Sequence, residues 1–477
     1  MARKKRRQAI ENLSITAYAA EGKSIGHLED GKVVFVAGAV PGDVVSVWPG
    51  KEKKNWMEAR LLRVETPSPD RVMPFCPHFG LCGGCKWQML PYEKQLQYKQ
   101  QQVTEQLRRI SGISLPEIQP IIGSAEDRYY RNKLEFTFSA TRYRTSAELA
   151  EAGDEKLPDE PGLGFHAPGL FDKVVPIHTC FLQPDPTNDV LRVLRAYTEH
   201  NALPYYNPKT REGWLRNVVL RVARTGEVLL NLILAYEDAP AREALLAHLL
   251  QEISGITSLH YTINPKVNDT IYDLEVVTVK GPGYITETLE DFSFKISPKS
   301  FFQTNTQQAE RMYREVRKAA GLSGKEVLYD LYCGTGSIGI FCSKGAGKII
   351  GIEAVEDAIA DAKENAAANG LSEKCHFYAG DVSKVCTPEF FRKHGRPDVL
   401  ITDPPRAGMH EDLIHQILAI AAPRVVYVSC NPATQARDLA LLDSTYRVTW
   451  LQPMDLFPQT HHIENIAVLE LRAATAE

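Results

Sequence analysis

One cysteine stands where a reactive thiol is expected. The stretch Ser429-Cys430-Asn431-Pro432 directly follows the apolar run Val425–Val428, which has the pattern of a buried strand. A free cysteine is more often a small buried hydrophobic residue. At the carboxyl end of a strand, with Asn-Pro breaking the chain immediately afterwards, the thiol of Cys430 is expected to face the ligand crevice of an α/β sheet. Cys430 is therefore a candidate nucleophile. A free thiol has a pKa of about 8.5, so it needs a neighbouring group to ionise, and the sequence does not identify that group.

A glycine-rich loop indicates a pocket for a nucleotide-type ligand. Residues 330–337 (Asp-Leu-Tyr-Cys-Gly-Thr-Gly-Ser) follow an apolar strand and open a helix, and Gly334 and Gly336 would let the backbone approach a ligand closely. Glu353 ends the next strand, where an acid binds ribose hydroxyls in such folds. A glycine loop alone is weak support, because a tight turn also needs glycine, but the downstream acid strengthens the prediction.

Two more acids follow later strands. Asp381 and Asp403 should converge with Glu353, because ligands of open α/β sheets bind beyond the carboxyl ends of the strands. This set resembles a class I S-adenosylmethionine-dependent methyltransferase. The stretch Gly334–Gly339 also satisfies the G-x-G-x-x-G string of NAD enzymes, so spacing alone leaves both cofactors open.

A candidate base lies near the end of the chain. Glu464, in His461-His462-Ile463-Glu464-Asn465, immediately precedes the last apolar run, Ile466–Leu469. Taken alone, it would be interpreted as an exposed acid at the start of a strand. Glu464 becomes a candidate base only when it is considered together with the motifs that precede it in the chain.

In this order the motifs resemble the RNA uracil-5-methyltransferase family. They are Phe301-Phe302-Gln303-Thr304-Asn305, Asp330–Gly336, Asp403-Pro404-Pro405-Arg406, Ser429–Pro432 and His462-Ile463-Glu464, with Ile463 where the family usually has valine. Tyr130-Arg131-Asn132-Lys133 resembles the central domain of that family and the N-terminal region resembles its TRAM domain, so the resemblance covers essentially the whole chain. It implies Cys430 as nucleophile, Glu464 as base, and cofactor contacts at Gln303, Tyr332, Glu353 and Asp403; the loop and strand-end pattern adds Gly334, Gly336 and Asp381.

The chemistry of uracil explains why such a family needs a thiol. C5 of uracil is too poor a nucleophile to take a methyl group directly, but a thiolate added at C6 makes C5 enolate-like, and a base can then remove the C5 proton. Cytosine-5 enzymes typically carry a cysteine after the Asp-Pro-Pro element, where this chain has Arg406. Adenine-N6 enzymes would leave Cys430 without a role, as would a non-catalytic RNA-binding protein, which we keep as the second class of function.

A second group of cysteines suggests metal chemistry. Cys76, Cys82 and Cys85 lie within ten residues. The nine cysteines do not indicate a secreted disulfide framework, because their number is odd, the chain is long and no export signal is found. Cys180 lies far downstream, and the four positions resemble the cluster ligands of the iron-sulfur members of the family, which implies a [4Fe-4S] centre. Zinc is the alternative, although structural zinc sites more typically show two Cys-x2-Cys pairs.

The elements that must position these residues fall into three predicted regions. Short alternating runs from Ser14 to Glu65 predict an OB-like β-barrel, here residues 1–67 with the basic tail. Residues 68–290 should form a central α+β domain that carries the iron-sulfur cluster. They include a helix at Tyr92–Ile110 and, at Thr141–Pro161, an insertion without a folded element. Residues 291–477 alternate strands and helices and predict a Rossmann-like methyltransferase domain with a parallel sheet.

Composition narrows the class of protein. The chain has 477 residues, 44% of them hydrophobic, with no apolar run long enough to cross a bilayer and no export signal, so we expect a cytoplasmic protein with no membrane partner. A formal charge of -4 means that RNA must be bound locally, with Arg3–Arg7 and the Lys51, Lys53, Lys54 cluster as candidates. The resemblance ranks 23S rRNA first and tRNA second as substrate, and no obligate protein partner is evident.

Overall fold

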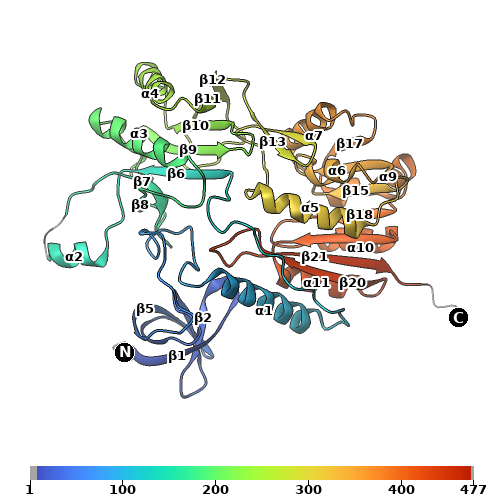
Figure 1. The fold of residues 1–477 in the computed structure, drawn as a ribbon, viewed down its shortest axis with the longest axis horizontal. Helices are drawn as coiled ribbons and strands as arrows, with labels where there is room; N and C mark the ends of the chain where they lie inside the picture. Colours follow the sequence, from blue (N-terminus) through green and yellow to red (C-terminus); the bar gives the residue numbers. More distant parts are fainter. Residues whose placement is uncertain (1–7, 154, 156, 474–477) are drawn as a thin grey trace, which may run out of the picture.

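The structure is a computed structural model that describes residues 8–153, 155 and 157–473. The basic tail predicted at Arg3–Arg7 lies outside the described residues. Figure 1 shows the described chain as a small barrel at the N-terminus, a mixed central layer and a C-terminal sheet. No helix of the described part is long and apolar enough to cross a membrane.

The N-terminal region is a closed five-stranded barrel in the order β1-β2-β3-β5-β4. Its strands are β1 (Ile10–Tyr18), β2 (Ser24–His27), β3 (Val33–Ala37), β4 (Val44–Glu52) and β5 (Trp56–Thr66), with a short 3₁₀ turn η1 (Ala20–Gly22) after β1. Alternate side chains point inward, as with Val34 and Val36 on β3, which are fully buried. The predicted small all-β barrel is confirmed, and the closed five-stranded form is consistent with an OB-like module.

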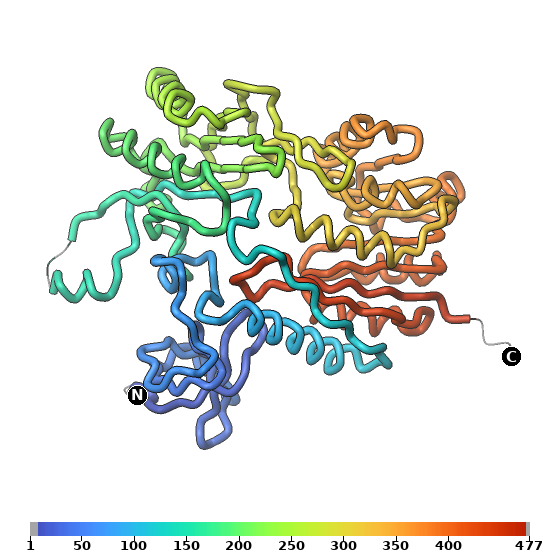
Figure 2. The backbone as a smooth tube through the Cα atoms, viewed as in Figure 1, coloured from blue at the N-terminus to red at the C-terminus, as the bar shows by residue number. Residues whose placement is uncertain are grey.

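Helix α1 (Tyr92–Ser111) connects the barrel to the C-terminal sheet and confirms the helix predicted at Tyr92–Ile110. It ends at Gly112, whose φ of 63° is the left-handed conformation common after a helix. Its buried side chains Val103 and Leu107 belong to the same apolar core as Tyr427 and Leu439 of the C-terminal domain. In Figure 2 the helix runs beneath the red strands rather than beside the green central layer.

The central layer is a seven-stranded sheet in the order β12-β11-β10-β9-β6-β7-β8. The strands are β6 (Lys133–Ser139), β7 (Gly162–His166), β8 (Val174–Pro176), β9 (Leu215–Val222), β10 (Val228–Leu234), β11 (Ile256–Ile263) and β12 (Val276–Lys280). They contain the strands predicted at Val218–Val222 and Val228–Leu234. Helices α3 (Thr187–His200) and α4 (Ala239–Glu252) pack on one face through Leu191 and Leu245.

The insertion at Thr141–Pro161 contains a helix, so the expectation of no folded element is wrong there. Helix α2 (Ser146–Ala152) buries no side chain, which explains why it shows no apolar period. It starts with a capping box, in which Thr145 Oγ1 accepts from the Glu148 N–H at 3.2 Å and a Glu148 carboxylate oxygen accepts from the Thr145 N–H at 2.7 Å. The Thr-x-x-Glu spacing was readable in the sequence.

The C-terminal sheet has seven strands in the order β17-β16-β15-β18-β19-β21-β20. They are β15 (Val327–Leu331), β16 (Lys348–Glu353), β17 (Cys375–Ala379), β18 (Val399–Thr402), β19 (Arg424–Ser429), β20 (Tyr446–Met454) and β21 (Glu464–Leu471). The first five in spatial order are parallel, as predicted, but β21 runs antiparallel to both β19 and β20. The expectation of a parallel sheet is therefore corrected at this edge, where a loop rather than a crossover helix joins β20 to β21.

Helices cover both faces of this sheet, which makes a three-layer α/β arrangement, as the alternation of strands and helices in residues 291–477 predicted. They are α5 (Thr306–Ala320), α6 (Ser337–Cys342), α7 (Glu356–Ala368), α8 (Val382–Val385), α9 (Pro388–His394), α10 (Glu411–Ile420) and α11 (Pro432–Leu442). A two-stranded hairpin, β13 (Ile285–Leu289) with β14 (Phe292–Ile296), precedes them and shares their core through Phe294. The predicted division at residue 290 falls within the turn of this hairpin.

Candidate active site

The register of the C-terminal sheet brings the predicted nucleophile and base together. Ser429, the last residue of β19, pairs with Asn465 on the antiparallel β21. Cys430 follows Ser429 and Glu464 precedes Asn465, so both lie at the same edge of the sheet, on neighbouring strands. Asp403 follows β18, the strand on the other side of β19, and therefore reaches that edge as well. Separate stretches of sequence thus supply one thiol and two carboxyl groups to one place.

Burial and mutual repulsion set the protonation of these groups. The pKa of Glu464 is raised well above its usual value by burial and by the charge of Asp403, and the guanidinium of Arg406 opposes this. Burial raises the pKa of Asp403 to about 7. For Cys430, burial first and then the charges of Glu464 and Asp403 raise the pKa to about 11, again opposed by Arg406. Without ligands the site therefore favours a neutral Cys430 thiol and a protonated Glu464, and it shifts Asp403 toward its protonated form.

Arg406 is a cation whose charge acts on both Cys430 and Glu464, and the sequence pattern did not single it out as a site residue. Its guanidinium lies 2.7 Å from His462 Nδ1, and its backbone carbonyl accepts from Asn431 Nδ2 at 3.0 Å. Burial and neighbouring positive charge lower the pKa of His462 to about 3, so the imidazole is neutral and can accept a hydrogen bond from the guanidinium. The position of Arg406 directly after Asp-Pro-Pro was the feature of the sequence that could have identified it as a site residue.

The glycine-rich loop makes an open cradle at the end of β15. Gly334 and Gly336 have φ of 53° and 76°, as the predicted close backbone approach requires, and Tyr332 also has a positive φ of 61°. The Gly334 N–H donates to Glu353 Oε2 at 3.2 Å, which joins the loop to the end of β16. A Cβ on Gly334 would meet no atom within 4 Å, whereas one on Gly336 would lie 2.8 Å from the Phe377 ring. Gly334 faces open space and Gly336 faces the packed interior.

Asp330 anchors the loop from beneath, although it was predicted only as part of the motif. Its carboxylate Oδ2 accepts from the Gly339 N–H at 2.9 Å, while Oδ1 has no partner in the described structure. Burial raises the pKa of Asp330 to about 7, against the lowering effect of the Gly339 hydrogen bond. An acid at the end of the strand that feeds a glycine loop was the signal in the sequence.

The two remaining predicted cofactor residues lie on either flank. Asp381 is exposed and caps α8, accepting from the Ser383 N–H at 2.9 Å, yet it is near enough to Tyr332 to contribute to its raised pKa. Gln303 is half-buried in the segment before α5, and its carbonyl accepts from Asn132 Nδ2 at 2.8 Å. Asn132 belongs to the Tyr-Arg-Asn-Lys stretch of the central layer, so that layer fixes the segment.

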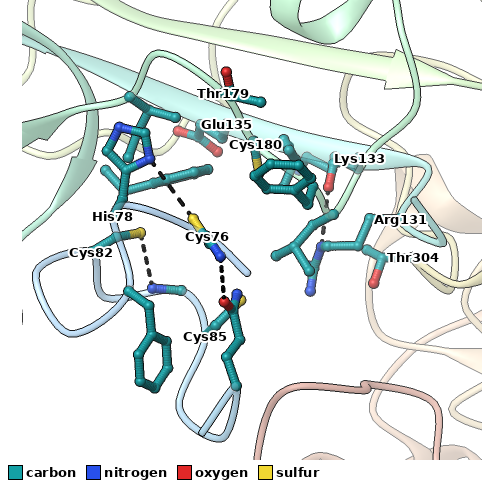
Figure 3. A pocket seen from close by; sticks show the side chains of 18 residues that line it. Cys76, His78, Cys82, Cys85, Arg131, Lys133, Glu135, Thr179, Cys180 and Thr304 are labelled. Carbon is teal, nitrogen blue, oxygen red and sulfur yellow. Dashed lines mark hydrogen bonds between the residues drawn. The ribbon is translucent and has the colours of Figure 1, made fainter. Parts of the chain in front are cut away.

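The four cysteines predicted as metal ligands line a separate cavity of about 390 Å³ (Figure 3). Cys76, Cys82 and Cys85 come from the segment after the barrel, and Cys180 comes from the central layer. All four are free thiols. Burial is the first cause that raises the pKa of each thiol, to about 12 for Cys85 and about 11 for Cys180. At Cys82, Cys85 and Cys180 the charges of neighbouring thiols raise the pKa further. Among the described residues, no group of three or more His, Cys, Asp or Glu side chains is placed so that it could hold a metal ion.

Known proteins resemble the chain over nearly its full length. The family model described as tRNA (uracil-5-)-methyltransferase matches residues 277–472. A protein of Bacteroides thetaiotaomicron named as an uncharacterized RNA methyltransferase is 50% identical over 458 residues, 95% of this chain and 100% of its own. One of Porphyromonas gingivalis with the same name is 48% identical, over 96% of this chain and 99% of its own.

A solved structure agrees with these relatives. The crystal structure of Pyrococcus abyssi tRNA (uracil-54, C5)-methyltransferase in complex with S-adenosyl-L-homocysteine has a TM-score of 0.74 and 27% identity, covering 96% of this chain and 100% of its own. S-adenosyl-L-homocysteine is what S-adenosylmethionine becomes when it gives up its methyl group. The fold, the near full-length relatives and the matched family agree, and the chain belongs to the class I S-adenosylmethionine-dependent RNA uracil-5-methyltransferases.

Proposed function

We propose that the protein methylates C5 of a specific uridine through a covalent bond between Cys430 and C6 of the base, with 23S rRNA as the first candidate substrate. The observation that carries the covalent mechanism is the register that sets Cys430 beside Glu464 at one edge of the sheet. The preference for ribosomal RNA rests on the cysteine pattern, which resembles that of the iron-sulfur members of the family. Transfer RNA is the second candidate, favoured by the similarity to the Pyrococcus abyssi enzyme.

The substrate is tested by mapping 5-methyluridine in the RNA of a strain that lacks the gene. Loss of one modified site in 23S rRNA, restored by the wild-type gene and not by Cys430→Ala, is expected. Loss confined to transfer RNA would contradict the ranking and leave the chemistry in place. Unchanged 5-methyluridine in both RNAs would contradict the proposed substrates.

The proposed cofactor contacts are Glu353 toward the ribose hydroxyls, Gly334 and Gly336 in the loop, and Tyr332, Asp381, Asp403 and Gln303 around it. The cradle fits such a ligand, because a Cβ on Gly334 would meet only open space and the Glu353 carboxylate already bonds the loop. S-adenosylmethionine, when bound, supplies the methyl group. Its positive charge also suits a sheet edge that carries the carboxyl groups of Asp403 and Glu464.

The chain's own residues account for the remaining steps. The Cys430 thiolate adds to C6 of uracil, which gives C5 the character of an enolate carbon. After C5 has been methylated, Glu464 removes the C5 proton, the electrons reform the C5–C6 double bond, and the thiolate leaves C6. A raised pKa makes the Glu464 carboxylate a stronger base than an exposed glutamate once it has ionised. Arg406, which lowers the pKa of both Cys430 and Glu464, is the described side chain that favours both ionised forms.

We further propose that Cys76, Cys82, Cys85 and Cys180 hold a [4Fe-4S] cluster, with zinc as the alternative. Support comes from the donor set: four thiols from two distant segments line one cavity. Bound there, the group would tie the segment after the barrel to the central layer and stabilise only states that keep all four thiolates in place. The proposed methyl transfer needs no electron, so the proposed role is structural.

Purification without oxygen tests the metal. The expected protein is brown and carries about four irons per chain, as a four-cysteine cluster would. Cys82→Ser should lose the colour together with thermal stability or RNA affinity, while the distant sheet keeps S-adenosylmethionine binding. Cys375→Ser is the matched control, since this buried cysteine lies in the C-terminal sheet. Stoichiometric zinc without iron would contradict the cluster.

The division into residues 1–67, 68–290 and 291–477, the TRAM identity of the barrel and the cytoplasmic location are proposals of the same kind. The barrel is proposed to bind RNA, the central layer to carry the cluster, and the C-terminal sheet to carry out methyl transfer. The structure adds that α1, in the middle region, packs on the C-terminal sheet.

A further inference from the structure

The loop that precedes Glu464 is buried, and many of its polar groups form hydrogen bonds with residues outside strands β20 and β21. Residues 455–463 connect β20 to β21, and Glu464 is the first residue of β21, paired with Met454. Most of this loop is buried, including Asp455, Gln459 and Ile463. A buried loop needs outside partners for its polar groups, because each unpaired group would cost free energy. Those partners decide where the proposed base lies.

Helix α1 supplies the strongest of them. Lys99 Nζ donates to Asp455 Oδ1 at 2.7 Å, and both side chains have an exposed fraction of 0%. The same ammonium donates to the Phe457 carbonyl at 3.1 Å. The Tyr92 hydroxyl donates to the second oxygen of Asp455 at 2.9 Å. The start of the loop is thus bonded to two side chains of one helix.

The middle of the loop is held from the same direction. Gln95 and Gln459 exchange hydrogen bonds: Gln95 Nε2 donates to Gln459 Oε1 at 3.0 Å, and the Gln459 N–H donates to Gln95 Oε1 at 2.9 Å. The backbone N–H groups of Lys86 and Trp87 both donate to the Gln459 carbonyl, at 2.8 and 3.1 Å. Figure 2 shows this red loop reaching out from the sheet to the blue segment and α1.

We propose that the buried Lys99–Asp455 ion pair positions Glu464 for proton removal. The pair holds the loop of residues 455–463 against α1, and this loop leads directly into Glu464. Neither residue touches the reacting atoms, so both are positioning residues. The inference rests on the proposed role of Glu464. It follows from geometry alone, because the loop enters β21 at Glu464 and a shift of its anchored start displaces that carboxylate relative to Cys430.

Loss of the pair should affect one step more than the others. Cys430 follows β19 and the cofactor cradle lies at the ends of β15 and β16, so none of these elements is part of this loop. Addition of the thiolate to C6 and cofactor binding should therefore persist in Lys99→Met. Removal of the C5 proton should slow by about tenfold to about 100-fold, the effect of moving a catalytic group by about 1 Å.

The test measures covalent complexes between enzyme and RNA under denaturing conditions. With ordinary substrate RNA, Lys99→Met should accumulate a methylated adduct, because elimination fails after addition, and Glu464→Gln should accumulate the same adduct. With 5-fluorouridine RNA it should be trapped as fast as the wild-type protein. Lys94→Met is the matched control, since Lys94 lies on the same helix and the change breaks its pair with Asp70, in which the side chains are 36% and 30% exposed. It should accumulate nothing.

Each other outcome overturns the proposal. If Glu464→Gln accumulates the adduct and Lys99→Met releases product at the wild-type rate, the positioning role is wrong and the base assignment stands. If Glu464→Gln accumulates none, the base assignment fails and the positioning role with it. If Lys94→Met behaves like Lys99→Met, the effect belongs to the whole helix.

A second variant guards against simple unfolding. Lys99→Met leaves Asp455 as a lone buried charge, whereas Lys99→Met with Asp455→Asn leaves none. If the single variant fails to bind S-adenosylmethionine, the double variant is measured instead, and the same accumulation is expected. A double variant that also loses cofactor binding and trapping would show that the pair maintains the fold, which overturns the proposal.

Discussion

Single ionisable groups at the sheet edge determine what the site can do. Burial raises the pKa of Cys430 to about 11, far from the thiolate that the proposed addition to C6 requires, and it raises the pKa of Asp403 to about 7. The cause is common to both, since burial comes first for each, so binding of positive charge in the pocket should favour the ionised forms of both groups together. We therefore expect ligand binding to activate the site.

Asp330 gives a prediction about pH. Its pKa of about 7 exceeds its unfolded value of about 3.9, so its proton stabilises the folded state, and this contribution is lost as pH rises from about 4 through about 7. Asn cannot ionise and keeps an acceptor for the Gly339 N–H. Asp330→Asn should therefore gain stability relative to the wild-type protein as pH rises, by at most about 1.4 kcal/mol per pH unit.

Unfolding of both proteins without cofactor, monitored from pH 4 to pH 8, measures this difference. It should grow up to about pH 7 and then level off. A difference that stays constant over this range would show that Asp330 is already ionised in the folded protein. Asp398→Asn, at the opposite end of the sheet before β18, controls for general effects of losing one acid.

At the scale of elements, Gly334 and Gly336 in the turn between β15 and α6 have different roles: Gly334 leaves space for a ligand, and Gly336 allows close packing. Both Gly334 and Gly336 have positive φ, so alanine at either position costs roughly 1–2 kcal/mol of backbone strain. Only at Gly336 would the new Cβ also strike Phe377. Gly336→Ala should therefore lower the thermal unfolding midpoint more than Gly334→Ala, while Gly334→Ala should lower S-adenosylmethionine affinity through a Cβ that enters the open cradle.

Thermal unfolding and calorimetric titration of the two variants measure these effects. Equal loss of stability with unchanged cofactor affinity in Gly334→Ala would mean that the open space at Gly334 is not where the cofactor binds. The contrast needs both variants, because each serves as the control for the backbone strain of the other.

The sequence predicted most elements that position the site, because strands such as Val327–Leu331 and Val399–Thr402 are continuous apolar runs with clear ends. It missed β20 (Tyr446–Met454), in which Gln452 and Pro453 interrupt the apolar pattern. It also missed α2, whose residues bury nothing. The Lys99–Asp455 ion pair could not be predicted from the sequence, because two residues far apart in the chain form no local pattern. The pair exists only because α1 packs on the C-terminal sheet.

At the scale of the molecule, the barrel is attached to the catalytic sheet and is not a free module. Gly22 of the barrel accepts from Trp87 Nε1 through its carbonyl at 3.4 Å, and a Cβ on Gly22 would lie 2.9 Å from His461. His461 neighbours His462, the partner of Arg406. RNA held by the barrel would therefore lie near the loop before Glu464, and removing the barrel would expose Trp87 as well as remove RNA contacts.

Surface charge tests the proposed RNA-binding role of the barrel without that side effect. Lys51, Lys53 and Lys54 are exposed at the end of β4 and in the following turn. If they bind phosphates, replacing all three with alanine should weaken RNA binding and reduce the slope of log affinity against log salt by about 0.7–0.9 for each phosphate that is no longer neutralised. S-adenosylmethionine affinity should not change. A salt slope equal to that of the wild-type protein would show that this cluster does not bind phosphates.

The central claim is that Cys430 bonds to C6 of the target uridine and that Glu464 completes the reaction. RNA carrying 5-fluorouridine at the target position tests it most directly, because the fluorine cannot leave as the proton does and the adduct persists. With S-adenosylmethionine present, the wild-type protein should give a denaturation-resistant complex whose mass includes enzyme, RNA and one methyl group, with the cross-link at Cys430. Cys430→Ala should give none, and Glu464→Gln should still be trapped. A complex that forms undiminished in Cys430→Ala would contradict the account.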